Sequence, residues 1–268
     1  MTETIAPQVH APETAGGRVR HRQGRARIRR GVPYSDPAST LSLLPGAAIG
    51  EWLADVHEVF AGRLLDAGAG NQPYREWYSP LVERVVAVDA APIEGLSALA
   101  FASRLPFAAG SFDTVLSTQV WEHVEDPAMA AREAFRVLRP GGHLVVTVPF
   151  FYPTHEAPHD YGRFTSYGLA ATLRNAGFEV VRLDAQGGPL LLGTHLCVLA
   201  ATQALNALGR LLRLRRPLSS LPVLRHLLAA PQQALIALRF RLRGPRRGIR
   251  FGAGLMTLGY FAVARKPG

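Results

Sequence analysis

The residues best suited to chemistry follow two short apolar runs. The first run, 63–67, ends in Gly68-Ala69-Gly70, and the second, 84–88, ends in Asp89. This pattern is typical of a nucleoside pocket in a doubly wound sheet. Glycines let a ligand lie against the backbone, and a carboxylate can accept hydrogen bonds from two ribose hydroxyls. Pro73 stands where a dinucleotide fingerprint has its third glycine, so the pattern does not favour NAD.

A second group of reactive side chains lies in the segment 150–165. His155 or His159 is the candidate general base, because a neutral imidazole accepts a proton near pH 7. We expect Asp160 to orient one of these histidines, and Arg163 or Tyr161 to hold an acceptor molecule. The alternative is a structural clamp in which His159 and Asp160 cap a helix that starts near Ser166.

The run 155–159, His-Glu-Ala-Pro-His, has the spacing of a zinc-protease motif. That motif needs both histidines on one face of a helix, and Pro158 disfavours a helix here. The sequence therefore predicts no metal site. His123, which follows Glu122, is expected to be structural or to line the pocket.

Alternating strands and helices must position these groups. The sequence predicts strands at 63–67, 84–89, 112–117 and 142–148, a further strand after Gly177, and a last one within 255–264. Helices are expected at 41–60 and 127–138. This alternation predicts an α/β fold whose mostly parallel sheet is covered by helices on both faces.

Four motifs in order carry a family resemblance: the glycine turn, Asp89, the run 105–124 and the run 134–149. Residues 60–188 resemble a class I S-adenosylmethionine (SAM)-dependent methyltransferase of the type-11 group. The resemblance implies a Rossmann-like seven-stranded fold, SAM as cofactor, and a last strand that lies antiparallel between the fifth and sixth strands.

The resemblance also implies which residues contact SAM. Asp66, Gly68 and Gly70 would border its methionine part, Asp89 would hold the ribose, and Thr118 and Gln119 would flank the sulfonium. Where many relatives carry Gly-Asp-Ala before the Leu-Pro-Phe segment, this chain has Ala-Phe-Ala, so Phe101 packs on the adenine or belongs to the core. The expected cofactor positions are Asp66, Ala67, Gly68, Gly70, Asp89, Ala90, Phe101, Leu105, Thr118 and Gln119.

The chain is expected to comprise four segments, of which the core is acidic and both flanks are basic. We expect a disordered Arg-rich tail (1–35), a methyltransferase core (36–188), a basic, apolar helical insertion before the last strand (189–254) and a final core strand (255–268). Residues 185–268 hold twelve arginines, one lysine and no acid. The insertion is expected to contact an anionic membrane surface, to form a lid over the cleft, or to pack on the sheet edge or a second copy.

The predicted function is methyl transfer to an oxygen or nitrogen of a small-molecule or lipid- or saccharide-linked acceptor. The loop around His155 is similar to one in type-11 members linked to cell-surface polysaccharide or lipid pathways. Cys197 is the one cysteine, and the N-terminus lacks a signal-peptide core, so we expect a cytoplasmic protein, peripheral at the inner face of the membrane. The alternatives are a catalytically silent scaffold and an RNA methyltransferase; a nucleic-acid partner is not expected, because no RNA module is recognisable.

Overall fold

The computed structural model describes residues 27–29, 32–34, 43–242 and 256–268. Its centre is a seven-stranded sheet with the order β5-β4-β3-β6-β7-β9-β8. The strands are β3 (Arg63–Ala67), β4 (Arg84–Asp89), β5 (Ala98–Leu99), β6 (Phe112–Thr118), β7 (Leu138–Pro149), β8 (Glu179–Ala185) and β9 (Gly259–Arg265). Only β9 runs antiparallel to its neighbours, β7 and β8. The predicted Rossmann-like fold with an antiparallel last strand is confirmed.

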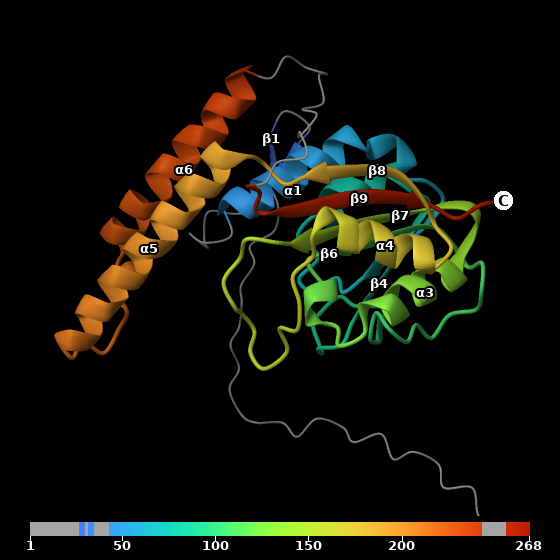
Figure 1. The fold of residues 1–268 in the computed structure, drawn as a ribbon, viewed down its shortest axis with the longest axis horizontal. Coiled ribbons are helices and arrows are strands. Elements are labelled where there is room, and N and C mark those ends of the chain that lie inside the picture. Colours follow the sequence, from blue (N-terminus) through green and yellow to red (C-terminus); the bar gives the residue numbers. More distant parts are fainter. Residues whose placement is uncertain (1–26, 30–31, 35–42, 243–255) are drawn as a thin grey trace, which may run out of the picture.

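Helices cover both faces of this sheet (Figure 1). One face carries α3 (Pro127–Val137) and α4 (Ser166–Asn175), and the other carries α1 (Leu43–Asp55). The short α2 (Arg75–Tyr78) follows the glycine turn. Side chains start two of the helices, because Asp126 accepts from the Met129 amide and Thr165 accepts from the Gly168 amide.

The core lies on both sides of the central strands. On the α1 face, Trp52 is fully buried, stacks on Phe261 of β9 at 4.8 Å, and donates a hydrogen bond of 2.8 Å to Asp184 of β8. These contacts fix α1 over the antiparallel half of the sheet. The sheet therefore lies between α1 on one face and α3 and α4 on the other (Figure 1).

Several element boundaries differ from expectation. Within the tail expected to be disordered, β1 (Arg27–Arg29) and β2 (Val32–Tyr34) form an antiparallel pair, and β2 contacts α1. The rest of 1–35 lies outside the described residues. The helix expected at 41–60 ends at Asp55 and is followed by a 3-10 turn, His57–Val59.

Between β8 and β9 the chain forms two long helices, α5 (Pro189–Leu211) and α6 (Pro222–Leu242), which lie side by side and extend beyond the sheet (Figure 1). We call residues 189–242 the arm and its turn, 211–221, the tip. Residues 243–254 lie outside the described part. By length and composition α5 could cross a membrane, but a single such helix is weak evidence for a span.

Candidate functional site

A cavity of about 1230 Å³ opens at the carboxyl ends of β3, β4 and β6. Its walls come from the glycine turn after β3, the end of β4, the segment after β6, the loop after β7 and one side of α5. Pockets for single small molecules are usually about 300–1,000 Å³. This cavity therefore has room for a nucleoside and a second molecule together.

The glycine turn brings bare backbone to the cavity wall. Gly68 and Gly70 have φ of +79° and +50°, a region that favours glycine. The Gly68 and Ala69 amides donate to the Val88 carbonyl at 2.9 Å, which closes the turn against β4. A Cβ built on Gly70 has no described atom within 4 Å, so the space beside it is open to a ligand.

Asp89 lies in the same wall, as the predicted ribose partner must. Its Oδ2 accepts from the Gly70 amide and its Oδ1 from the Ala91 amide, both at 2.9 Å. These bonds fix the direction of the carboxylate, and each oxygen keeps a further lone pair for a hydroxyl donor. Gly68, Gly70 and Asp89 thus fit the nucleoside part of SAM.

Not every predicted cofactor residue reaches the cavity. Among the described residues, Asp66, Ala67 and Leu105 are buried outside the lining. Asp66 accepts a hydrogen bond of 2.6 Å from Tyr78, and burial raises its pKa to about 6. Asp66 and Ala67 end β3 directly before the turn, and Leu105 lies apart from it, where its amide donates to Glu133.

The other predicted cofactor positions do line the cavity: Ala90, Phe101, Thr118 and Gln119. Phe101 is 59% exposed, so it is a wall residue and not part of the core. Gln119 has φ of +54° and donates through Nε2 to the Thr147 hydroxyl at 3.1 Å. Ser103, which the sequence analysis did not single out, adds a hydroxyl to the wall that holds Phe101.

The loop after β7 separates its four candidate catalytic residues into two pairs. His155 and His159 line the cavity, whereas Asp160 and Arg163 are not among its described lining residues. Arg163 donates to both carboxylate oxygens of Asp160, at 2.5 and 2.8 Å, and to the carbonyls of Tyr152 and Pro153. The expectation that Arg163 holds an acceptor is therefore corrected: its guanidinium clamps the loop.

Asp160 orients His155, as expected. Its Oδ2 accepts from the His155 amide at 2.9 Å and lies 3.4 Å from Nδ1 of the same residue. The Arg163 guanidinium holds the pKa of this carboxyl well below its usual range, so it stays ionised. The alternative in which His159 and Asp160 cap α4 is wrong, because Thr165 makes that cap.

One wall of the cavity comes from the arm, the segment for which a lid over the cleft was one of the expected roles, although none of its residues was predicted for the site. His195, Leu199, Thr202 and Asn206 repeat at helical spacing along α5 and line the cavity. His195 is 1% exposed and stacks on Tyr152 at 5.6 Å, and burial lowers its pKa to about 4. It is therefore neutral at pH 7. Polar residues at this spacing in an otherwise apolar helix are the sequence pattern that could have predicted this wall.

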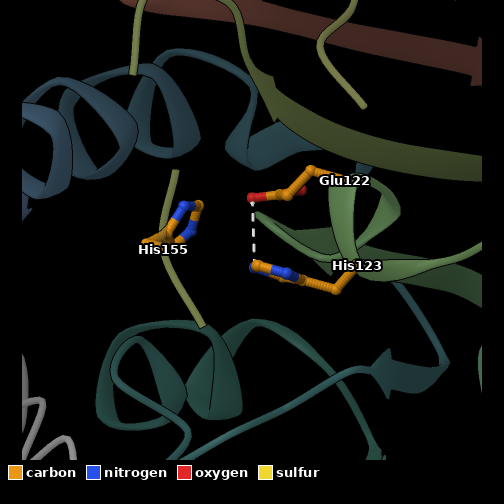
Figure 2. A group of neighbouring side chains, drawn as sticks. All are labelled: Glu122, His123 and His155. Atoms are coloured by element: carbon orange, nitrogen blue, oxygen red, sulfur yellow. Dashed lines mark ion pairs between the residues drawn. The ribbon is translucent and has the colours of Figure 1, made fainter. Parts of the chain in front are cut away.

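Glu122, His123 and His155 form a second cluster (Figure 2), in which His155 is a candidate base and His123 lines the cavity, whereas Glu122 was given no role from the sequence. Glu122 and His123 follow β6 in a 3-10 turn, and His155 faces them from the loop after β7. Glu122 is fully buried, and its Oε1 lies 3.7 Å from His123 Nε2. The His123 and His155 ring centroids are 4.7 Å apart. Burial raises the pKa of Glu122 to about 8.

Comparisons with known proteins agree with this geometry. Residues 65–146 match a family model described as a methyltransferase domain. A Mycolicibacterium smegmatis protein named as a SAM-dependent methyltransferase is 29% identical over 56% of this chain and 68% of its own length. A ubiquinone biosynthesis O-methyltransferase of Ralstonia nicotianae is 34% identical over 38% of this chain and 48% of its own. The chain spans about half or less of the length of the other curated relatives that it matches.

Solved structures share the fold at low identity. The [4+2]-cyclase SpnF superimposes with a TM-score of 0.53 at 21% identity, covering 91% of this chain and 89% of that one. A Galdieria sulphuraria protein named as a sarcosine dimethylglycine methyltransferase gives 0.52 at 16% identity, covering 88% and 92%. Because one neighbour is a cyclase, the fold alone does not fix the reaction, and the site must decide it.

Proposed function

We propose that this chain is a class I SAM-dependent methyltransferase of the type-11 group, and that it transfers a methyl group from SAM to a small-molecule acceptor. One observation carries the proposal. The glycine turn and Asp89 share a single cavity with His155 and His159, so a nucleoside and a proton acceptor have places in the same space.

The chain's residues divide the work of such a reaction. Gly68, Gly70 and Asp89 hold the nucleoside, and Thr118 and Gln119 lie at the end of β6, beside the reacting centre. When bound, SAM supplies an electrophilic methyl group. His155 or His159 takes the proton of the acceptor, because an imidazole is a suitable base near pH 7. The α5 wall shields this space from water.

The finer proposal is an acceptor linked to a lipid or to a lipid-borne saccharide, reached at a membrane surface. The tip of the arm holds Leu211, Leu212 and Leu214, which are 78%, 59% and 47% exposed. Arg213, Arg215 and Arg216 lie between and beside them, and residues 185–268 contain no acid. Exposed leucines next to arginines suit the headgroup region of an anionic bilayer.

This proposal connects the arm to the active site. α5 runs from the cavity, which its residues His195 and Asn206 line, to the exposed tip. A tip held in a bilayer interface would therefore bring the open cavity close to lipid-linked acceptors. The corresponding location is the cytoplasm, at the inner face of the membrane.

Methyl transfer is tested with SAM labelled on its methyl group, incubated with the full chain and a bacterial lipid extract. We expect label to enter the organic phase with wild type and to fall strongly with H155A and H159A, while S-adenosylhomocysteine still binds all three proteins. Label that enters only water-soluble compounds would overturn the lipid-linked acceptor. Binding of SAM without consumption in any fraction would instead identify a scaffold.

Membrane contact is tested by co-sedimentation with vesicles of phosphatidylcholine, with and without phosphatidylglycerol. Each arginine near an anionic surface adds about 1 kcal/mol of binding, so R213Q/R215Q/R216Q should weaken binding by at least tenfold. L211Q/L212Q/L214Q should weaken binding to both vesicle types, since it removes apolar contact. The matched control R174Q, on α4 at the opposite face of the sheet, should bind as wild type. Equal binding of all proteins to neutral vesicles would contradict the proposal.

A further inference from the structure

The cluster of Glu122, His123 and His155 has the composition of a metal site. Each residue offers one ligand atom, and these three atoms lie within 4.8 Å of one another. Two imidazole nitrogens and one carboxylate oxygen form a ligand set used by catalytic Zn²⁺ and by related transition-metal ions. Mg²⁺ and Ca²⁺ prefer oxygen ligands alone and suit this set poorly.

The buried carboxylate points to a missing partner. Glu122 is fully buried, and among the described residues neither of its carboxylate oxygens bonds to another residue. A buried carboxyl without partners is costly, and proteins normally place a cation or a donor beside it. His123 Nε2 lies 3.7 Å from Oε1. A cation between these atoms would satisfy both.

Both histidines are held in the orientation that a metal ligand needs. His123 Nδ1 is 2.6 Å from the His159 carbonyl, so Nδ1 carries the hydrogen and Nε2 keeps its lone pair toward Glu122. His155 Nδ1 lies 3.2 Å from the Pro153 carbonyl and 3.4 Å from Asp160 Oδ2. Metal-binding histidines commonly donate their other nitrogen to a carbonyl or carboxylate in this way.

The distances between the three ligand atoms are slightly larger than in a site that holds a metal ion. Ligand atoms around tetrahedral Zn²⁺, with bonds of about 2.1 Å, lie about 3.4 Å apart. Glu122 Oε1 and His123 Nε2 are already near this distance, and the ligand atom of His155 lies within 4.8 Å of both. The Glu156 carboxylate is 3.9 Å from His123 Nε2 and half-exposed, so a fourth protein ligand is available.

We propose that Glu122, His123 and His155 bind one divalent transition-metal ion, Zn²⁺ or Mn²⁺, which coordinates a hydroxyl oxygen of the acceptor. His123 and His155 both line the cavity that Gly68 and Gln119 border, so the ion would face the methyl-transfer space. This inference rests on the proposed function and narrows it to an oxygen acceptor, because a metal ion makes a bound hydroxyl more acidic.

The transfer step then has defined partners. The acceptor oxygen forms its bond to the methyl carbon while the carbon–sulfur bond breaks, with the electron pair remaining on sulfur. The hydroxyl proton passes to His159, since His155 is engaged by the ion. His159 Nδ1 is 3.0 Å from the Tyr161 hydroxyl, which in turn donates to Glu125, so this imidazole has a route for its proton.

Metal binding is tested on the full chain after chelator treatment and dialysis. We expect one Zn²⁺ or Mn²⁺ per chain by equilibrium dialysis, little Mg²⁺, and visible absorption bands when Co²⁺ is added. E122Q, H123A and H155A each alter a ligand and should weaken binding by at least about 10- to 100-fold, the cost of losing an outer-shell partner. Zn²⁺ should also raise the melting temperature of wild type but not that of E122Q.

H159A is the matched control, because His159 is the second histidine of the His-Glu-x-x-His run but lies outside the cluster. It should keep full stoichiometry. Metal loss in H159A with retention in E122Q would overturn the proposal in favour of that run. Wild type that binds S-adenosylhomocysteine but no metal would overturn the metal site alone, whereas failure to bind S-adenosylhomocysteine would overturn the proposed function.

Discussion

Replacement of Asp89 tests the nucleoside pocket directly. In D89A the ribose loses two charge-assisted hydrogen bonds, each contributing about 1.5–3 kcal/mol. Even the lower values together predict S-adenosylhomocysteine binding at least about 100-fold weaker than wild type. D89N keeps one acceptor oxygen in place and should lie between the two. Isothermal titration calorimetry of the three proteins measures the series.

A fold defect must be separated from a binding defect in this series. The Gly70 and Ala91 amides lose their acceptor in D89A, but Asp89 is not buried and water can replace it, so stability should fall by only about 1 kcal/mol. The melting temperature should then drop by about 2–4 °C. E179A, at an exposed carboxylate on β8, should bind as wild type. Binding by folded D89A within about twofold of wild type would refute the pocket assignment.

Substitutions at three further positions test the supports of the site. G68A should abolish S-adenosylhomocysteine binding and lower the melting temperature, because φ is +79° and a Cβ would lie 2.3 Å from Val120; unchanged calorimetry would contradict the turn geometry. T165A should cost about 1 kcal/mol in urea unfolding by removing the α4 cap, and T165S should recover most of it. Burial raises the Asp66 pKa from 3.8 to about 6, so the folded state favours the protonated form. Its stabilising contribution, up to ~3 kcal/mol, is complete below pH 4 and lost as pH rises through 6. In the ligand-free protein, D66N should remove this part of the pH dependence of the free energy of unfolding. Parallel curves of this free energy against pH for D66N and wild type would refute the assignment.

Local sequence patterns were sufficient to predict most of the sheet. The strands expected at 63–67 and 84–89 have the observed bounds, because a buried parallel strand needs a short apolar run between turn residues. β5 has only two residues and leaves no such pattern. The pair β1–β2 lies in an Arg- and Gly-rich segment without a strand period, and its contact with α1 is tertiary.

A site residue could be predicted where its place follows from the order of the elements along the chain. It could not be predicted where its place depends on packing between distant segments. Asp89 follows β4 directly, so its place at the sheet edge follows from the sequence. Arg163 lies in a loop whose path depends on many contacts, and the residue type alone did not distinguish a clamp from a substrate contact. The burial of Glu122 was not predicted, because charged residues are usually exposed and its surroundings come from distant segments.

The position of β9 has a consequence for how the chain matures on the ribosome. β7 and β8 emerge first, then the long arm, and only afterwards the strand that separates them. During that interval the edges of β7 and β8 that will pair with β9 are exposed. Exposed strand edges can pair with strands of other chains. A nascent polypeptide whose synthesis stops within the arm should therefore tend to aggregate and to bind chaperones. This holds even though the glycine turn of the cofactor pocket has already been synthesised.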